Sequence, residues 1–315
     1  MNYSHVLVTG GAGFIGSHLC RYLLANGKRV YCIDNLSTGS LDNIADLIHN
    51  PNFVWLRHDV AESFRLTEID AVFALACPES PLYCKAHPEQ TIRTCVSGIY
   101  YTLELARRAG IPIVFASGSA VYGKTEIISP AISIQQGCIS PRSVYDEGKR
   151  CAETMCFDYR LRYGLNVKVA RIFSTYGPAM QIDSGLAICN FIKRALRGDP
   201  LQLLGDGSQQ RSFCFISDTI SALCKLMNTP ENVSGPLNIG NSAEISIREL
   251  AEQILKLTGS KSQIEYRPLP CDESRNVSPD MTLTEQVLNW KPEISIGDGL
   301  AETIRSFKER LNKNE

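Results

Sequence analysis

The chain has 315 residues, of which 44% are hydrophobic and 21% charged; these ordinary values exclude an extended disordered or fibrous chain. Its 32 Lys and Arg against 33 Asp and Glu give a net charge of -1, so we expect no nucleic-acid partner. No apolar run reaches the roughly 18 residues that a membrane span needs, so we expect a cytoplasmic protein with no membrane partner.

The 12 cysteines are scattered along the chain and form no CxxC pair. They stand among apolar residues, which is typical of buried free thiols rather than of disulfides or zinc ligands. We therefore expect no metal site.

The first half of the chain alternates short apolar, β-rich runs with longer helical stretches. The predicted strands cover residues 5–9, 30–34, 53–58, 71–76, 113–117 and 166–173. Continuous apolar runs of this kind are typical of parallel strands that crossover helices cover on both faces. The sequence therefore predicts an α/β fold with a Rossmann-type doubly wound parallel sheet.

A second region begins after Tyr176, where glycine-rich loops, further helices and a proline-rich segment follow. Amphipathic helices are predicted over 246–257, with Ser246 as N-cap, and over 299–311. We expect a first domain over 1–176 and a smaller C-terminal α/β lobe, which binds the substrate, over 177–315. Residues 212–240 are expected to pack back onto the first domain.

A glycine-rich turn joins the first predicted strand to a helix. Gly10, Gly13 and Gly16 permit a tight turn, close approach of a pyrophosphate to bare backbone, and packing of the helix against the strand. Phe14 and Ile15 open that helix, whose N-terminus faces the phosphates. These five residues are predicted to bind a dinucleotide.

Asp34 ends the second predicted strand, where its carboxylate would accept hydrogen bonds from an adenosine ribose and repel a 2′-phosphate. Neither Asn35 nor Leu36 supplies a cation for such a phosphate, so the sequence predicts NAD rather than NADP, with Asn35 beside it. Asp59, after the third strand, is a candidate for the adenine amino group; the alternative is a solvated loop carboxylate.

Tyr145 and Lys149 are four residues apart, which places a phenol and an ammonium on one helical face. An ordinary phenol, with a pKa near about 10, is a poor base at neutral pH, but a neighbouring lysine and a positive nicotinamide ring favour its ionised form. The pair is therefore predicted to be catalytic, with Tyr145 as base and Lys149 lowering its pKa, and to contact the cofactor.

Nearly the whole chain resembles the extended short-chain dehydrogenase/reductases, and within them the sugar-nucleotide epimerases, dehydratases and decarboxylases. The likeness to UDP-glucuronate decarboxylases is greatest, and the matching blocks include 9–16, 76–81, 145–155, 176–178, 190–213 and 238–241. The resemblance implies NAD in the first lobe, a UDP-sugar in the second, and a homodimer built from helices around 83–107 and 145–162.

The resemblance also implies that Arg211 binds the nucleotide diphosphate, a role that suits a planar guanidinium; the alternative is a surface ion pair. Asn190 and Tyr266 are further candidates for substrate contacts. Ser174, which stands where the family has Asn, is included with them.

Several polar positions of the family are changed together. Gly118 stands where the family has Thr or Ser, Ala120 where decarboxylases and dehydratases have Glu, Val277 where decarboxylases have Arg, and Ala179 where the family has Arg. Ser119 or Ser117 could orient the sugar hydroxyl instead, and Arg275 could replace the lost arginine. We assign Ser119 to the catalytic and substrate-binding residues.

The predicted function is oxidation at C4 of a UDP-sugar with NAD, with decarboxylation of UDP-glucuronate as the leading reaction. A 4-keto uronate is a β-keto acid that can lose carbon dioxide without the missing Glu. A 4-epimerase tolerates Ala120 well, whereas a dehydratase suffers more because it needs an acid and a base. The alternative to an enzyme is a protein that binds NAD but catalyses no reaction and acts as a binding or regulatory protein.

Overall fold

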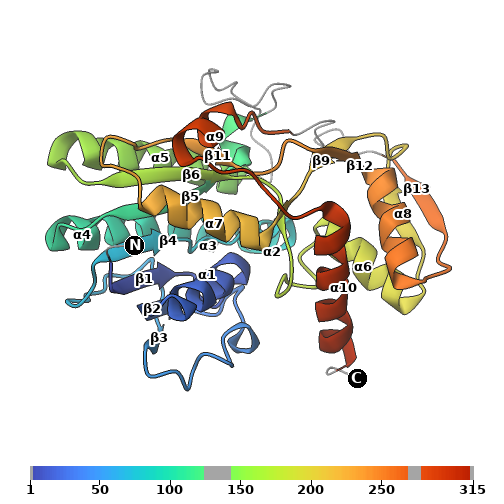
Figure 1. Ribbon diagram of the computed structural model, residues 1–315, viewed down its shortest axis with the longest axis horizontal. Coiled ribbons are helices and arrows are strands. Elements are labelled where there is room, and N and C mark those ends of the chain that lie inside the picture. The colour runs from blue at the N-terminus through green and yellow to red at the C-terminus, as the bar shows by residue number, and fades with distance from the viewer. Residues whose placement is uncertain (1–2, 124–142, 269–277, 313–315) are drawn as a thin grey trace.

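The computed structural model describes residues 3–123, 143–268 and 278–312 (Figure 1). Its first lobe is built on a seven-stranded sheet of order β11-β6-β5-β4-β1-β2-β3, in which every neighbouring pair is parallel. The strands are β1 (His5–Thr9), β2 (Arg29–Asp34), β3 (Phe53–Arg57), β4 (Ala71–Ala74), β5 (Ile113–Gly118), β6 (Val167–Ile172) and β11 (Leu237–Ile239). The predicted doubly wound α/β fold is confirmed.

Helices cover both faces of this sheet, which is why its strands are continuously apolar. On β1, Val6 and Val8 face one buried core, with α1 (Phe14–Ala25) and α7 (Ile216–Met227). Leu7 faces the other core, with α4 (Ile99–Ala109) and α5 (Ser143–Tyr163). The shorter helical segments of this lobe are η1 (Leu41–Asn43), α2 (Pro81–Ala86), α3 (Pro88–Arg93), the π-helical turn η2 (Thr94–Gly98) and η3 (Ser119–Tyr122).

The second lobe contains α6 (Ala187–Arg197), α8 (Ile247–Thr258) and α10 (Ile296–Asn312), which lie beside the carboxyl end of the sheet (Figure 1). It also holds β8 (Leu201–Leu204) paired with β13 (Ile264–Arg267), and β9 (Gln210–Ser212) paired with β12 (Glu244–Ser246). Two short strands, β7 (Thr175–Tyr176) and β10 (Cys214–Phe215), pair with each other. Helix α9 (Thr282–Leu288) packs against β11 of the first lobe, where the Thr284 hydroxyl donates to the Asn238 carbonyl at 2.6 Å.

Local chemistry explains where α8 begins. Ser246 is its N-cap, as predicted: the Ser246 hydroxyl accepts a hydrogen bond from the Glu249 backbone N–H at 3.1 Å, and the Glu249 carboxylate accepts one from the Ser246 N–H at 2.9 Å. This reciprocal arrangement satisfies two N–H groups that a helix start otherwise leaves unpaired. Helix α10 begins three residues before the predicted 299, at Ile296.

A buried ion pair ties α5 to the sheet. The Arg171 guanidinium on β6 donates two hydrogen bonds, of 2.9 and 2.7 Å, to the Glu153 carboxylate on α5. The same guanidinium lies 4.5 Å from the ring centroid of Tyr122, whose hydroxyl donates to Asn238 on β11 at 2.6 Å. One charged network therefore connects α5, β6, η3 and β11.

Within the described residues, no helix is both long enough and apolar enough to cross a bilayer.

We expect Glu153→Gln to lower the free energy of unfolding by about 3–5 kcal/mol, because the Arg171 charge then stays buried without its counter-ion. The matched control is Asp158→Asn on the same helix, which removes the exposed pair with Arg162 and leaves stability close to that of the wild type. Urea denaturation measures both, and equal losses in the two variants would contradict the prediction.

Candidate active site

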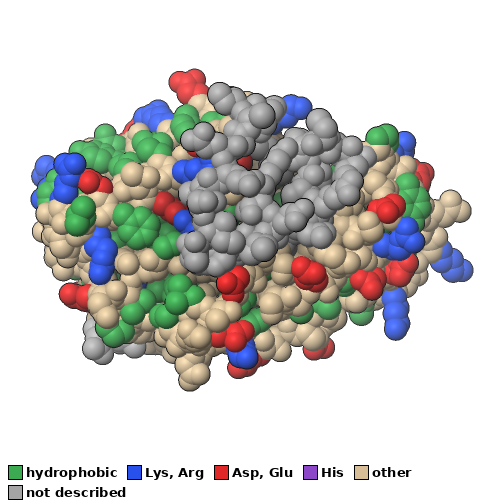
Figure 2. All heavy atoms as spheres, turned by 90° about the horizontal axis from the view of Figure 1, so that it is seen from above, with side chains coloured by type: hydrophobic (Ala, Val, Ile, Leu, Met, Phe, Trp, Pro, Cys, Tyr) green, Lys and Arg blue, Asp and Glu red, His purple; other side chains and the backbone are tan. Residues whose placement is uncertain are grey.

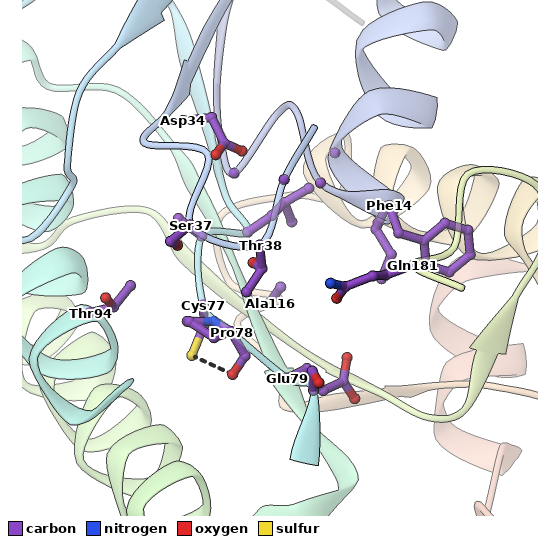
Figure 3. A pocket seen from close by; sticks show the side chains of 18 of the residues that line it. Phe14, Asp34, Ser37, Thr38, Cys77, Pro78, Glu79, Thr94, Ala116 and Gln181 are labelled. Carbon is purple, nitrogen blue, oxygen red and sulfur yellow. Dashed lines mark hydrogen bonds between the residues drawn. The ribbon is translucent and has the colours of Figure 1, made fainter. Parts of the chain in front are cut away.

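A cavity of about 310 Å³ opens at the carboxyl edge of the sheet (Figure 3). Its walls come from the turn after β1, the end of β2, the loops after β4 and β5, and α5. The second lobe closes it with residues 179–181, Ser184, Leu186 and Arg310. The cavity thus lies beside β1, where the strand order reverses and where doubly wound sheets bind ligands.

The turn after β1 admits only glycine at two positions. Gly10 has a φ of +71°, and a Cβ added there would lie 2.8 Å from the Ala76 Cα. A Cβ on Gly16 would lie 2.1 Å from the Gly10 carbonyl oxygen, which accepts a hydrogen bond from the Gly13 N–H at 3.1 Å. The turn therefore brings bare backbone to the cavity.

All five residues predicted in this turn line the cavity: Gly10, Gly13, Phe14, Ile15 and Gly16. Helix α1 begins at Phe14, and its N-cap makes no side-chain hydrogen bond. The first N–H groups of the helix, and the positive end of its dipole, thus remain available to an anion.

Asp34 and Asn35 also line the cavity. The Asp34 carboxylate accepts hydrogen bonds from the N–H groups of Ala12, at 3.0 Å, and Leu36, at 2.8 Å. Burial raises the pKa of Asp34, and these backbone hydrogen bonds act against the rise. Each carboxylate oxygen keeps further acceptor capacity for a ribose hydroxyl.

Asp59 is not among the residues that line the cavity, although His58 and Val60 are. Its carboxylate accepts hydrogen bonds from the Gln90 amide at 3.0 Å and from the Ala61 N–H at 2.9 Å. These partners hold the carboxylate between the loop after β3 and helix α3, so the structure does not bring Asp59 to the cavity wall.

Tyr145 and Lys149 both line the cavity, as neighbours on one face of α5. The Lys149 Nζ donates to the Ala116 carbonyl at 2.7 Å and lies 5.7 Å from the centroid of the Tyr145 ring. The Tyr145 hydroxyl lies against Gly118, where an added Cβ would be 3.1 Å from it. The end of β5 therefore positions both polar groups.

Burial raises the pKa of Tyr145 well above its usual value, and the negative charge of Glu79 adds to the rise. This direction is opposite to the lowering predicted from Lys149. Spacing along a helix shows that the ammonium is near, but it does not show how completely the phenol is desolvated. Desolvation is the larger effect here.

The two serines near the end of β5 differ in place. Ser117 lines the cavity, and its buried hydroxyl has no hydrogen-bond partner among the described residues. Ser119 begins η3, is only partly buried, and is absent from the cavity wall. Of the two serines, Ser117 is therefore the one that the structure places at the cavity.

Like Ser119, the other four predicted substrate contacts do not line the cavity. Arg211 is half-buried on β9 and donates to the Gln210 carbonyl at 3.0 Å, and the exposed Tyr266 on β13 lies under the Arg248 guanidinium at 5.6 Å. Asn190 and Ser174 are exposed, and Asn190 donates to the Gly185 carbonyl at 3.2 Å. The second lobe carries three of them on β9, β13 and α6, and Ser174 lies on the connection between β6 and β7.

Of the changed family positions, Gly118 and Ala179 line the cavity, with Ala179 at a φ of +66°. Ala120 does not line it, and Arg275 and Val277 lie outside the described residues. Cys77 and Glu79 were not among the predicted site residues, but the loop after β4 brings both into the wall (Figure 3). The sequence contained a signal for these two residues, because residues that follow the strands next to β1 contact the ligand in such a sheet.

Comparison with known proteins defines the class. Residues 6–240 match the NAD dependent epimerase/dehydratase family, and the chain belongs to that family. Its glycine turn, open helix N-terminus and Asp34 carboxylate fit the dinucleotide of that class.

Two relatives cover almost the whole chain. UDP-glucuronic acid decarboxylase 3 of Arabidopsis thaliana is 43% identical over 98% of this chain and 90% of its own length. UDP-glucuronic acid decarboxylase 1 of Danio rerio is 40% identical over 97% of this chain and 73% of its own length. The resemblance found in the sequence is confirmed.

Among solved structures, the UDP-glucuronic acid 4-epimerase from Bacillus cereus, in complex with UDP-glucuronic acid and NAD, superposes with a TM-score of 0.87. It is 28% identical, and the match covers 97% of this chain and 99% of that one.

We expect Gly16→Ala to weaken NAD binding by at least about tenfold, which corresponds to about 1.4 kcal/mol. The reason is steric, because the new Cβ would sit 2.1 Å from the Gly10 oxygen. Isothermal titration calorimetry with NAD measures the affinity, and circular dichroism checks the fold. Gly297→Ala is the control, since its Cβ has no neighbour nearer than 4.0 Å. Unchanged affinity in Gly16→Ala would refute the assignment of this turn.

Proposed function

We propose that this protein oxidises the 4-hydroxyl of a UDP-sugar, and that its leading reaction is the decarboxylation of UDP-glucuronate. One observation carries the proposal: Tyr145 and Lys149 share a single cavity with the glycine turn and Asp34. The relatives named as UDP-glucuronic acid decarboxylases, at 40 to 43% identity across the chain, support the choice of substrate.

The first lobe holds the cofactor in this proposal. Backbone N–H groups at the start of α1 bind the pyrophosphate of NAD, and Asp34 accepts hydrogen bonds from the adenosine ribose. Bound NAD supplies the group that accepts the hydride from C4 of the sugar.

Tyr145 removes the proton of the sugar 4-hydroxyl. Lys149 stabilises with its charge the Tyr145 phenolate that accepts this proton, and the Ala116 carbonyl orients the ammonium. With Gly118 contributing no hydroxyl, Ser117 takes the role of orienting the sugar, because it is the serine near the end of β5 that lines the cavity. Oxidation of a glucuronate gives a β-keto acid, which loses carbon dioxide with its electron pair passing to the ketone.

A 4-epimerase is the second candidate, supported by the fold match to the Bacillus cereus enzyme. Epimerisation returns the hydride to the other face of the keto sugar and requires no further acid or base at Ala120.

We also propose a homodimer. Helices α4 and α5 expose large apolar side chains, namely Tyr100 (43% exposed), Leu161 (85%) and Tyr163 (54%). Figure 2 shows hydrophobic side chains on the surface at the left end, where these two helices lie in Figure 1. Pairing with a second copy would bury them.

The cytoplasmic location stays a prediction.

The reaction is tested by Tyr145→Phe, which keeps the ring and removes the acid–base group. We expect carbon dioxide release from UDP-glucuronate to fall by about a hundredfold to ten-thousandfold. Tyr163→Phe, at the exposed end of the same helix, serves as control. Nuclear magnetic resonance identifies the product.

A product epimerised at C4, with no carbon dioxide, would assign the epimerase instead. A protein that binds NAD but yields neither product, nor any NADH absorbance, with UDP-glucuronate and a panel of other nucleotide sugars would overturn the proposal in favour of a silent binding protein.

The pH dependence follows from the raised pKa of Tyr145. Because the base is the phenolate, kcat/KM is expected to rise with pH between about 6.5 and 9.5. Glu79→Gln removes a negative charge that raises this pKa, so its rising limb should move to lower pH. Glu79→Asp keeps the charge and is the control. A limb that stays in place, or moves to higher pH, would contradict the assignment of Tyr145 as base.

A further inference from the structure

Two cysteines meet beside the active site. The sulfur atoms of Cys77, on the loop after β4, and Cys95, in η2, are 2.7 Å apart. They need to approach by only about 0.7 Å to reach the length of a disulfide bond, about 2.05 Å. We propose that Cys77 and Cys95 form a peroxide-sensitive thiol pair, which hydrogen peroxide converts reversibly into a disulfide in the wall of the catalytic cavity.

The surroundings of the pair favour reaction at this place. Cys77 lines the large cavity, and both thiols line a second cavity of about 10 Å³ together with Lys149. That volume is close to the minimum for one water molecule. An oxidant of about that size is therefore favoured, whereas a bulky thiol disulfide is excluded from Cys95, which is 3% exposed.

The two thiols differ in acidity. The hydrogen bond from Cys77 lowers the pKa of Cys95, and the positive charge of Lys149 acts in the same direction, against desolvation. Burial raises the pKa of Cys77 well above its usual value. Cys95 is therefore the more acidic thiol and the one that attacks the peroxide, and Cys77 is the thiol that resolves the first product.

The chemistry is a two-electron oxidation. The Cys95 thiolate attacks one oxygen of hydrogen peroxide, the O–O bond breaks, and the departing hydroxide takes up a proton, leaving Cys95 as a sulfenic acid. The Cys77 sulfur then attacks the Cys95 sulfur; the S–O bond breaks, and the hydroxide leaves as water with the Cys77 proton. Two thiols are oxidised, and one peroxide is reduced to two waters.

The backbone around the pair determines what moves. Gly148 of α5 packs against Cys95 so closely that an added Cβ would lie 2.8 Å from the Cys95 Cβ. Cys95 therefore cannot move toward α5, and the approach must draw in Cys77 and the loop that carries Pro78 and Glu79, labelled in Figure 3. Displacing this wall next to Tyr145 and Lys149 is expected to slow turnover about tenfold to a hundredfold.

The first experiment treats the full-length protein with a small molar excess of hydrogen peroxide and maps its peptides under non-reducing conditions. We expect a peptide pair joined through Cys77 and Cys95, lighter by two hydrogens and separated again by dithiothreitol. Glutathione disulfide should give this product far more slowly. Cross-links spread over many cysteines, or equal rates with both oxidants, would overturn the proposal.

Three variants refine this test. Cys77→Ser should leave a Cys95 sulfenic acid, detected as one added oxygen in the mass of the peptide that contains Cys95, and Cys95→Ser should leave Cys77 unmodified. Cys151→Ser, which removes an exposed thiol on α5, is the control and should cross-link like the wild type. Preferential oxidation of Cys151 in the wild type would contradict the proposal. The peptide map of the wild-type protein tests the proposal even where a variant fails to fold.

The loss of turnover rests on the proposed function, but the cross-link does not. A specific disulfide in a protein that proves inactive with every sugar would overturn only the proposed function. An active protein whose turnover survives complete cross-linking would overturn only the effect of the disulfide on catalysis.

Discussion

The hydrogen bond from the Lys149 ammonium to the Ala116 carbonyl joins the part of α5 that carries Tyr145 to the carboxyl end of β5. A buried ammonium is costly unless it finds a partner, and the last residues of β5 provide one. The ring of Phe115, whose centroid lies 5.0 Å from the Lys149 nitrogen, adds a favourable π-face. Because Tyr145 lies one turn earlier on the same helix, this bond also determines where the phenol meets the cavity, against Gly118.

Two influences compete at that phenol. Lys149 favours its ionised form, whereas burial and the carboxylate of Glu79 favour the neutral form and prevail. Charges 4 to 6 Å away act strongly only where water is excluded, yet exclusion of water is itself what penalises the phenolate. For Tyr145 to act as a base near neutral pH, a site of this kind therefore needs a further positive charge in the cavity. Such a charge lowers the pKa of the phenol, as Lys149 does.

The sequence predicted the features that depend on short stretches of chain. The six predicted strands are present with ends that differ by at most two residues, because double burial makes them continuously apolar. The glycine turn and the Tyr145 and Lys149 pair were recognisable because their spacing is local. Residues joined by long-range contacts were not: Asp59 is held by Gln90 of α3, and Cys77 meets Cys95 of η2, in each case between a loop and a helical segment that no local pattern brings together. Ser119 does not line the cavity because the chain leaves strand geometry at η3, so the alternation of β5 ends at Gly118.

The cavity keeps polar side chains although this chain has lost several of the family's polar residues. Near Tyr145 stand a buried hydroxyl, Ser117, a carboxylate, Glu79, and an ammonium, Lys149, each on a different element of the first lobe. A buried polar group is costly unless it finds a partner, and the buried Ser117 and Lys149 stand together with Glu79 in one cavity wall. Their retention beside Tyr145 favours a protein that still binds a polar substrate at this end of the cavity over one that has lost the need for it.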